Sequence, residues 1–112
     1  MYTPITREEL IAALDVDAVT LVEALPATQY DAEHLPGAIN VPGELSAARA
    51  AQIAPVRDRT VVAYCSGPAC GRSKVTAAAF DALGYTAVRV YTGGMADWFA
   101  AGLPFEGARV AS

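Results

Sequence analysis

Residues 61–73 read VVAYCSGPACGRS, and the rest of the chain is arranged around this stretch. The apolar run Val61–Tyr64 predicts a buried strand, and it ends in Cys65. A loop rich in Gly and Pro follows, and Arg72 and Ser73 then open a helical pattern. A cysteine next to a helix N-terminus lies near unpaired backbone N–H groups and a partial positive charge, which favour an anion. We therefore expect Cys65 to have a lowered pKa and to act as a nucleophilic thiolate.

The composition suits one domain with its own core. The chain has 112 residues, of which 54% are hydrophobic, and we expect a single domain over residues 1–112 with a core at about 5–106. A net charge of −4 disfavours nucleic acid and anionic membranes as partners. No apolar run reaches the roughly 18 residues of a spanning helix. The first residues lack the basic and apolar regions of a secretory signal, so we expect a cytoplasmic protein.

Predicted strands and helices alternate along the chain. Thr6 and Glu9 form a capping box that starts the first helix. The predicted helices cover 6–15, a short segment after Pro26, 43–53, 72–83 and 95–101, and the predicted strands cover 19–22, 38–40, 60–64 and 87–91. This alternation predicts a mainly parallel sheet with helices on both faces. Ligands bind such sheets at the carboxyl ends of the strands, where Cys65 falls.

The helix predicted over 72–83 has a repeating apolar pattern. Val75, Ala79 and Leu83 recur at every fourth position, with Phe80 beside them. We expect these residues to face the sheet, and Gly84 to end the helix.

A set of motifs in a fixed order resembles the rhodanese-like, or sulfurtransferase, domains. The motifs are HLPGAINVP at 34–42, Tyr64-Cys65, Arg72-Ser73, Leu83-Gly84-Tyr85, and Gly93-Gly94 followed by Trp98, and they span about Leu21 to Pro104. The resemblance implies a single rhodanese-like α/β domain, with a central parallel five-stranded sheet flanked by helices on both faces. It also implies that Cys65 takes sulfane sulfur from a donor such as thiosulfate, forms a persulfide, and passes the sulfur to a thiol or cyanide.

The sequence departs from the common family pattern in two places. The segment Glu23–Leu25 lacks the arginine of the family's Asp-x-Arg motif. Six residues, rather than four, separate Cys65 from Arg72, and the longer loop contains Cys70. This Cys-x-Gly-Pro-x-Cys form resembles a sub-branch that is also found in domains fused to transcription regulators.

The candidate active-site loop has Cys65 as its catalytic residue. Its substrate-binding members are Ser66, Gly67, Pro68, Ala69, Cys70, Gly71, Arg72 and Ser73. We expect the amides of residues 66–71 to surround the persulfide, with Gly67 and Gly71 providing unusual dihedral angles. Arg72 would bind the oxyanion of a donor, or brace the loop by bonding its carbonyls. Ser73 would donate to the Cys65 sulfur or cap the helix.

Two readings of Cys70 remain open. It would resolve a persulfide or sulfenate on Cys65 by forming a disulfide, which needs Cα atoms about 4.4–6.8 Å apart, or it would pack beneath the loop unreacted. We expect no cofactor and no metal, because a closed zinc site needs four ligands and the chain offers two cysteines and His34. His34 is expected to tie its own turn by hydrogen bonds.

The expected partner is a small sulfur-containing substrate or an acceptor thiol, including a protein thiol. The leading hypothesis is a sulfurtransferase. The alternatives are a dithiol redox enzyme or sensor that uses Cys65 and Cys70, and a non-catalytic binding module. A cysteine phosphatase is disfavoured, because its loop has five residues between cysteine and arginine. The oligomeric state stays open.

Overall fold

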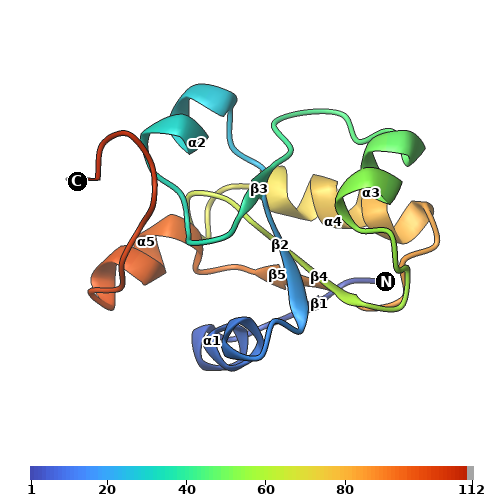
Figure 1. The fold of residues 1–112 in the computed structure, drawn as a ribbon, viewed down its shortest axis with the longest axis horizontal. Helices are drawn as coiled ribbons and strands as arrows, with labels where there is room; N and C mark the ends of the chain where they lie inside the picture. The colour runs from blue at the N-terminus through green and yellow to red at the C-terminus, as the bar shows by residue number, and fades with distance from the viewer. Residues whose placement is uncertain (111–112) are drawn as a thin grey trace.

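The computed structural model describes residues 1–110, and strands and helices alternate along them (Figure 1). The elements are β1 Thr3–Pro4, α1 Arg7–Asp15, β2 Val19–Glu23, α2 Ala27–Ala32, β3 Ile39–Asn40, α3 Ala47–Ile53, β4 Thr60–Tyr64, α4 Arg72–Ala82, β5 Val88–Tyr91 and α5 Gly94–Ala100. The predicted capping box is confirmed. The Glu9 amide donates to Thr6 Oγ1 at 3.1 Å, and the Thr6 amide donates to Glu9 Oε1 at 3.0 Å.

The strands form one parallel sheet in the order β1-β5-β4-β2-β3, which confirms the expected α/β fold. The central strand, β4, pairs with β2 from Val19↔Thr60 to Glu23↔Tyr64, and with β5 up to Tyr64↔Tyr91. The pattern of the sequence did not predict β1. It is a two-residue edge strand, and an edge is where a sheet accommodates Pro4.

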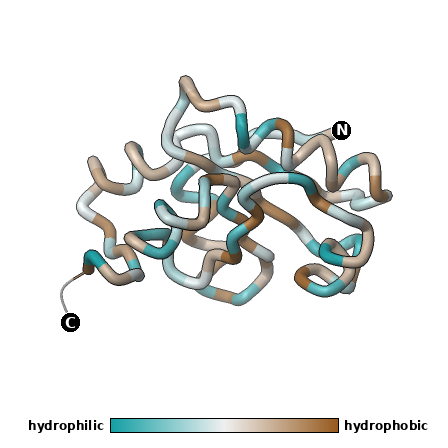
Figure 2. Tube along the Cα trace, turned by 90° about the horizontal axis from the view of Figure 1, so that it is seen from above, coloured by the Kyte–Doolittle hydropathy of each residue, from teal (hydrophilic) through white to brown (hydrophobic). Residues whose placement is uncertain are grey.

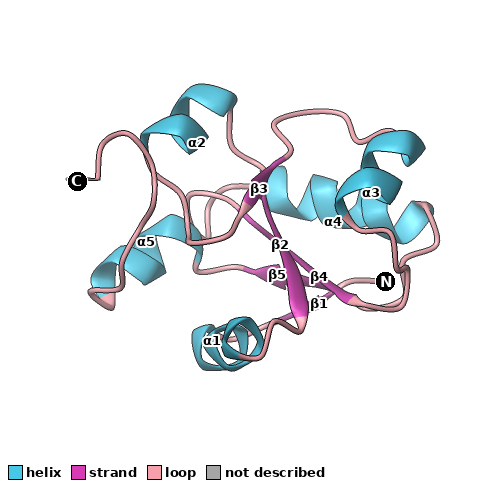
Figure 3. Ribbon diagram, in the orientation of Figure 1, coloured by secondary structure: helices cyan, strands magenta, loops and turns pink. Residues whose placement is uncertain are grey.

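Two hydrophobic clusters cover the two faces of the sheet. Figure 3 shows the helices arranged around the strands. Successive residues of β4 point to opposite faces, so Val61 and Ala63 pack on the α3 and α4 side, and Val62 and Tyr64 pack on the α1 and α5 side. Hydrophobic segments run through the middle of the trace (Figure 2). A sheet buried on both faces explains why the β4 sequence is continuously apolar.

Two helix predictions were wrong in detail. Val75 is 72% exposed, whereas Phe80 is buried as expected and Leu83 packs against the same cluster. Ser73, Thr76 and Ala77 complete the buried face of α4. These residues also have helical spacing, and their mostly small side chains let the helix lie close to the sheet. The helix predicted from residue 43 begins only at Ala47, because the Ser46 hydroxyl caps it by accepting from the Arg49 amide at 3.0 Å.

Candidate active site at the Cys65–Cys70 loop

The loop after β4 begins at the carboxyl edge of the sheet, as predicted. The N-terminal turn of α5 holds its first two residues, because the Met95 amide donates to the Cys65 carbonyl at 3.0 Å and the Ala96 amide donates to the Ser66 carbonyl at 2.9 Å. Gly94 makes this close approach possible. It has φ +58°, and a Cβ on it would lie 2.3 Å from the Cys65 carbonyl oxygen.

Gly67 and Gly71 do not have the role predicted for them. Neither is among the positive-φ glycines of residues 1–110. A Cβ on Gly71 would meet nothing within 4 Å, and one on Gly67 would make an ordinary 3.5 Å contact with the Cβ of Ala96. The glycine that this site needs is therefore Gly94, which comes from a distant part of the chain.

The Cys65 side chain is buried against the base of the loop. It is 2% exposed and packs with Ala24, Leu25, Cys70 and Met95. Its Sγ lies 3.3 Å from the Oγ of Ser73, which is buried in the first turn of α4, and 3.4 Å from the Cys70 carbonyl oxygen. Ser73 thus contacts the sulfur as predicted, but the Cys65 thiol is the donor and the serine hydroxyl accepts. The alternative prediction that Ser73 caps α4 is wrong, because the N-cap is Gly71.

The predicted lowering of the Cys65 pKa is wrong. Burial raises the pKa of Cys65, and the neighbouring Cys70 side chain raises it further, against hydrogen bonds from Ser73 that lower it. The helix N-terminus lies where it was predicted, but loss of water around the sulfur outweighs its effect. Both cysteines are free thiols.

Cys70 is the more acidic thiol of the two. Burial alone would raise its pKa, but hydrogen bonds from the Cys65 thiol and from the Arg72 and Ser66 amides lower the pKa to about 7. The Ser66 amide, one of those expected around Cys65, therefore stabilises the Cys70 thiolate together with the Arg72 amide. The Cys70 amide donates to the Gly67 carbonyl at 3.1 Å, which closes the turn that brings the second cysteine back to the first.

Arg72 braces the site from the first turn of α4. Its Nε donates to the Ala24 carbonyl at 2.8 Å, and its Nη2 donates to the Pro42 carbonyl at 2.6 Å. These carbonyls belong to the segments that follow β2 and β3, not to the cysteine loop itself. The guanidinium thus ties three chain segments together at the carboxyl edge of the sheet.

Sequence reasoning assigned no chemistry to Glu23, which proves to be buried beside the site. Its Oε1 accepts from the Tyr64 hydroxyl at 3.1 Å, and its Oε2 has no hydrogen-bond partner. Burial raises the pKa of Glu23 to about 7, although Tyr64 and His34 act in the opposite direction. The sequence feature that could have indicated this buried carboxyl group is the position of Glu23 directly after the run Val19–Val22.

His34 has the structural environment that was expected for it. Its Nδ1 lies 2.7 Å from the Tyr30 carbonyl oxygen, and its ring stacks on the Tyr30 ring with centroids 3.9 Å apart.

Within residues 1–110, no three His, Cys, Asp or Glu side chains are grouped as metal ligands would be. The helices over the same range are all too short or too polar to cross a membrane.

A cavity of about 490 Å³ opens beside the loop. Its lining residues come from α2, the loop, α5 and the C-terminal segment: Leu25, Thr28, Gln29, Ala32, Glu33, Ser66, Met95 and Arg109. Leu25 and Met95 also pack against Cys65, so this cavity borders the cysteine pair.

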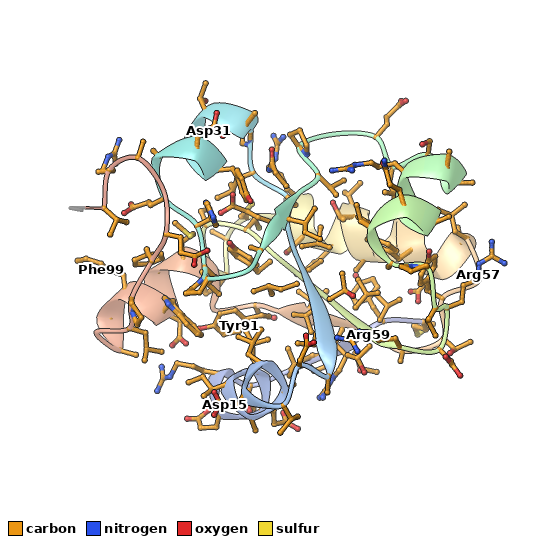
Figure 4. The ribbon with its side chains drawn as sticks, viewed as in Figure 1. Asp15, Asp31, Arg57, Arg59, Tyr91 and Phe99 are labelled. Carbon is orange, nitrogen blue, oxygen red and sulfur yellow. The ribbon has the colours of Figure 1, made fainter. Side chains whose placement is uncertain are left out.

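A second hollow of about 470 Å³ extends from α1 to Trp98, and no cysteine lines it. Figure 4 shows Tyr91 beside the α1 and α5 layer, and Phe99 on the outer side of α5.

Comparison with known proteins decides the family. The model of the rhodanese-like domain matches residues 6–101, which is most of the chain.

This chain belongs to the rhodanese-like domain family.

Relatives of this rhodanese-like domain occur in different protein contexts. It is 40% identical over 107 residues to the HTH-type transcriptional regulator Rv0324 of Mycobacterium tuberculosis, and the match covers 95% of this chain. The rhodanese-like domain spans 46% of that regulator's length.

Solved structures share the fold of this rhodanese-like domain. The BH2092 protein from Bacillus halodurans has a TM-score of 0.87 at 24% identity, covering 96% of this chain and 78% of that one. The thiosulfate sulfurtransferase from Pseudomonas aeruginosa has a TM-score of 0.78 at 27% identity, covering 95% of this chain and 20% of that one.

Proposed function

We propose that this rhodanese-like domain is a sulfurtransferase that carries sulfane sulfur as a persulfide on Cys65. The observation that carries the proposal is the placement of Cys65. It directly follows the central strand of a rhodanese-like sheet, and its Sγ lies 3.3 Å from Ser73 in the first turn of α4. The structural likeness to a thiosulfate sulfurtransferase supports the same reaction class.

The cysteine pair suggests how Cys65 becomes reactive despite its raised pKa. The Cys65 Sγ lies 3.4 Å from the Cys70 carbonyl oxygen, and its side chain packs against that of Cys70, whose thiolate is already populated near neutral pH. The Cys70 thiolate takes the proton of Cys65 as general base. Cys65 then attacks the outer sulfur of thiosulfate, the S–S bond of the donor breaks, and sulfite leaves with the electron pair. This leaves a persulfide on Cys65 and a neutral thiol on Cys70.

The acceptor is proposed to be a thiol or cyanide that enters through the cavity beside Ser66. This cavity has both apolar walls, at Leu25 and Met95, and polar walls, at Gln29 and Arg109. A small thiol or the cysteine of another protein would suit it, and nucleic acid is not a proposed partner. We also propose that the domain works in the cytoplasm, where free thiols persist.

Sulfur loading tests the proposal directly. The Cys70→Ser variant is incubated with thiosulfate, and its intact mass is measured after removal of the donor. Because this variant lacks the Cys70 general base, we expect a slow gain of one sulfur atom over a long incubation, which cyanide then removes. The matched Cys65→Ser variant should gain nothing. The proposal fails if Cys70→Ser takes up no sulfur from thiosulfate or polysulfide, or if Cys65→Ser takes up as much.

A dithiol redox enzyme or sensor is the second candidate, and the packing of the two free cysteines Cys65 and Cys70 in one cluster favours it. The similarity to a transcriptional regulator suits a domain that signals its thiol state to a DNA-binding partner. In this case mild oxidant without a sulfur donor removes two hydrogens from the wild-type mass, and either cysteine substitution prevents the loss. A wild-type protein that takes up sulfur but resists such oxidation would argue against the redox function.

A further inference from the structure

The longer loop brings its second cysteine back onto the first. The 3.1 Å hydrogen bond from the Cys70 amide to the Gly67 carbonyl closes a turn, and the Cys65 Sγ lies 3.4 Å from the Cys70 carbonyl oxygen. The two cysteine side chains pack in one cluster with Leu25 and Met95. A sulfur atom added to Cys65 would therefore be attached beside a second thiol.

The two cysteines differ in their access to solvent. Cys65 is buried, whereas Cys70 is half-buried in a loop whose other residues Ser66, Pro68, Ala69 and Gly71 are exposed. The Ser66 and Arg72 amides face the Cys70 sulfur and stabilise its negative charge. Cys70 is thus an activated thiol that solvent components reach more readily than Cys65.

We propose that Cys70 resolves the Cys65 persulfide, so that the domain releases hydrosulfide and forms a Cys65–Cys70 disulfide. The inference rests on the proposed function. The Cys70 sulfur attacks the Cys65 Sγ, and a bond forms between these two sulfur atoms. The bond from Sγ to the outer sulfur breaks, and the outer sulfur leaves with its electron pair and the proton of the Cys70 thiol as HS⁻. The outer sulfur is reduced to sulfide, and the two cysteine sulfurs supply the two electrons.

A dithiol reductant completes the cycle by thiol–disulfide exchange. Its first thiol attacks the disulfide, its second thiol releases the mixed disulfide, and both cysteines return to the thiol form. The half-buried Cys70 and the cavity beside Ser66 give such a reductant access. The net reaction converts sulfane sulfur and a dithiol into sulfide and a disulfide, so the acceptor class for this site is a dithiol.

The test compares three proteins under anaerobic conditions. Wild type, Cys70→Ser and Cys65→Ser each receive thiosulfate without reductant, and intact mass and released sulfide are both measured. We expect wild type to lose two hydrogens and release one equivalent of sulfide. Cys70→Ser should gain one sulfur and release no sulfide, and Cys65→Ser should do neither. With a dithiol added, wild type should release several equivalents of sulfide.

The outcomes separate the inference from the proposed function. A stable gain of sulfur on wild type, with no sulfide released, overturns the inference and leaves the sulfurtransferase proposal intact. Loss of two hydrogens without matching sulfide also overturns it, because an oxidant would then be responsible. Absence of sulfur uptake by both wild type and Cys70→Ser counts against the proposed function itself. Cys70→Ala, checked by circular dichroism, replaces Cys70→Ser if that variant does not fold.

Discussion

At the scale of single residues, the two cysteines have complementary environments. Cys65 is nearly inaccessible and is held by Ser73, whereas Cys70 is half-buried and faces two backbone amides. These environments move the two pKa values in opposite directions. Cys70 therefore holds the negative charge of the pair, and Cys65 holds the proton.

The acidity of Cys70 predicts the pH dependence of its alkylation. Only the thiolate reacts with iodoacetamide, so the alkylation rate of Cys70 should rise with a midpoint near its pKa of about 7. Cys65→Ala removes a hydrogen bond that stabilises the thiolate, so the midpoint should move to higher pH. Peptide mass spectrometry at several pH values measures both rates. An unchanged midpoint in Cys65→Ala, or faster alkylation of Cys65 than of Cys70, would contradict this account.

At the scale of elements, the position of the loop depends on the starts of two helices. The first turn of α5 binds the carbonyls of Cys65 and Ser66, and Arg72 in the first turn of α4 binds the carbonyls of Ala24 and Pro42. The loop itself needs no left-handed residue, because neither Gly67 nor Gly71 has positive φ. The geometry of the site is therefore imposed by helices packed against the sheet.

Gly94→Ala tests this dependence on α5. An added Cβ would overlap the Cys65 carbonyl, and alanine strains the backbone at φ +58°. We expect sulfur loading to slow at least about tenfold, and the free energy of unfolding to fall by about 1–3 kcal/mol. Timed mass spectrometry and urea denaturation measure the two effects.

Gly43→Ala is the matched control for Gly94→Ala. Gly43 lies outside the cysteine loop, lacks a positive φ, and has nothing within 4 Å of an added Cβ. It should load sulfur at the wild-type rate. If Gly94→Ala also behaves like wild type, the α5 contact does not position Cys65.

At the scale of the whole molecule, a buried carboxyl group joins the central strands to the turn before β3. Glu23 on β2 accepts from the Tyr64 hydroxyl on β4, and that hydroxyl accepts from the Leu35 amide at 3.0 Å. The other titratable groups that act on Glu23 are His34 and Tyr30. Because burial favours the neutral form of Glu23, the folded state binds a proton that the unfolded chain releases near pH 4.5.

Stability should therefore depend on pH through Glu23. The contribution of the protonated carboxyl is complete below about pH 4.5 and is lost as the pH rises through about 7. Glu23→Gln keeps a neutral group that accepts from Tyr64. We expect it to exceed wild type by about 1–3 kcal/mol in free energy of unfolding at pH 8, and to match wild type near pH 4.5. Urea denaturation across this range measures the difference.

The control for this prediction is the exposed Glu44. Glu44→Gln should reproduce the wild-type dependence of unfolding free energy on pH. If Glu23→Gln keeps the wild-type slope between pH 4.5 and 7, Glu23 is ionised in the folded protein at these values.

The order of elements was open to prediction because it depends on local patterns. Capping at Thr6, the apolar run Val61–Tyr64 and the glycine after α4 each act over a few residues, and they were enough to predict an alternating α/β domain. The motif order indicated the rhodanese-like family and directed attention to Cys65. The edge strand β1 was missed, since two residues carry no periodicity.

The chemistry of the site was decided by the tertiary structure, because desolvation and hydrogen bonding depend on contacts between distant residues. The sequence placed Cys65 at a helix N-terminus, but it did not show that burial would outweigh this effect or that the Ser66 and Arg72 amides would stabilise a thiolate on Cys70. It did not show that Gly94 would approach the Cys65 carbonyl, nor that Glu23 would be buried beside Tyr64. The sequence by itself determined the fold and placed the two candidate cysteines in one loop; only packing across the sheet decided which thiol carries the charge.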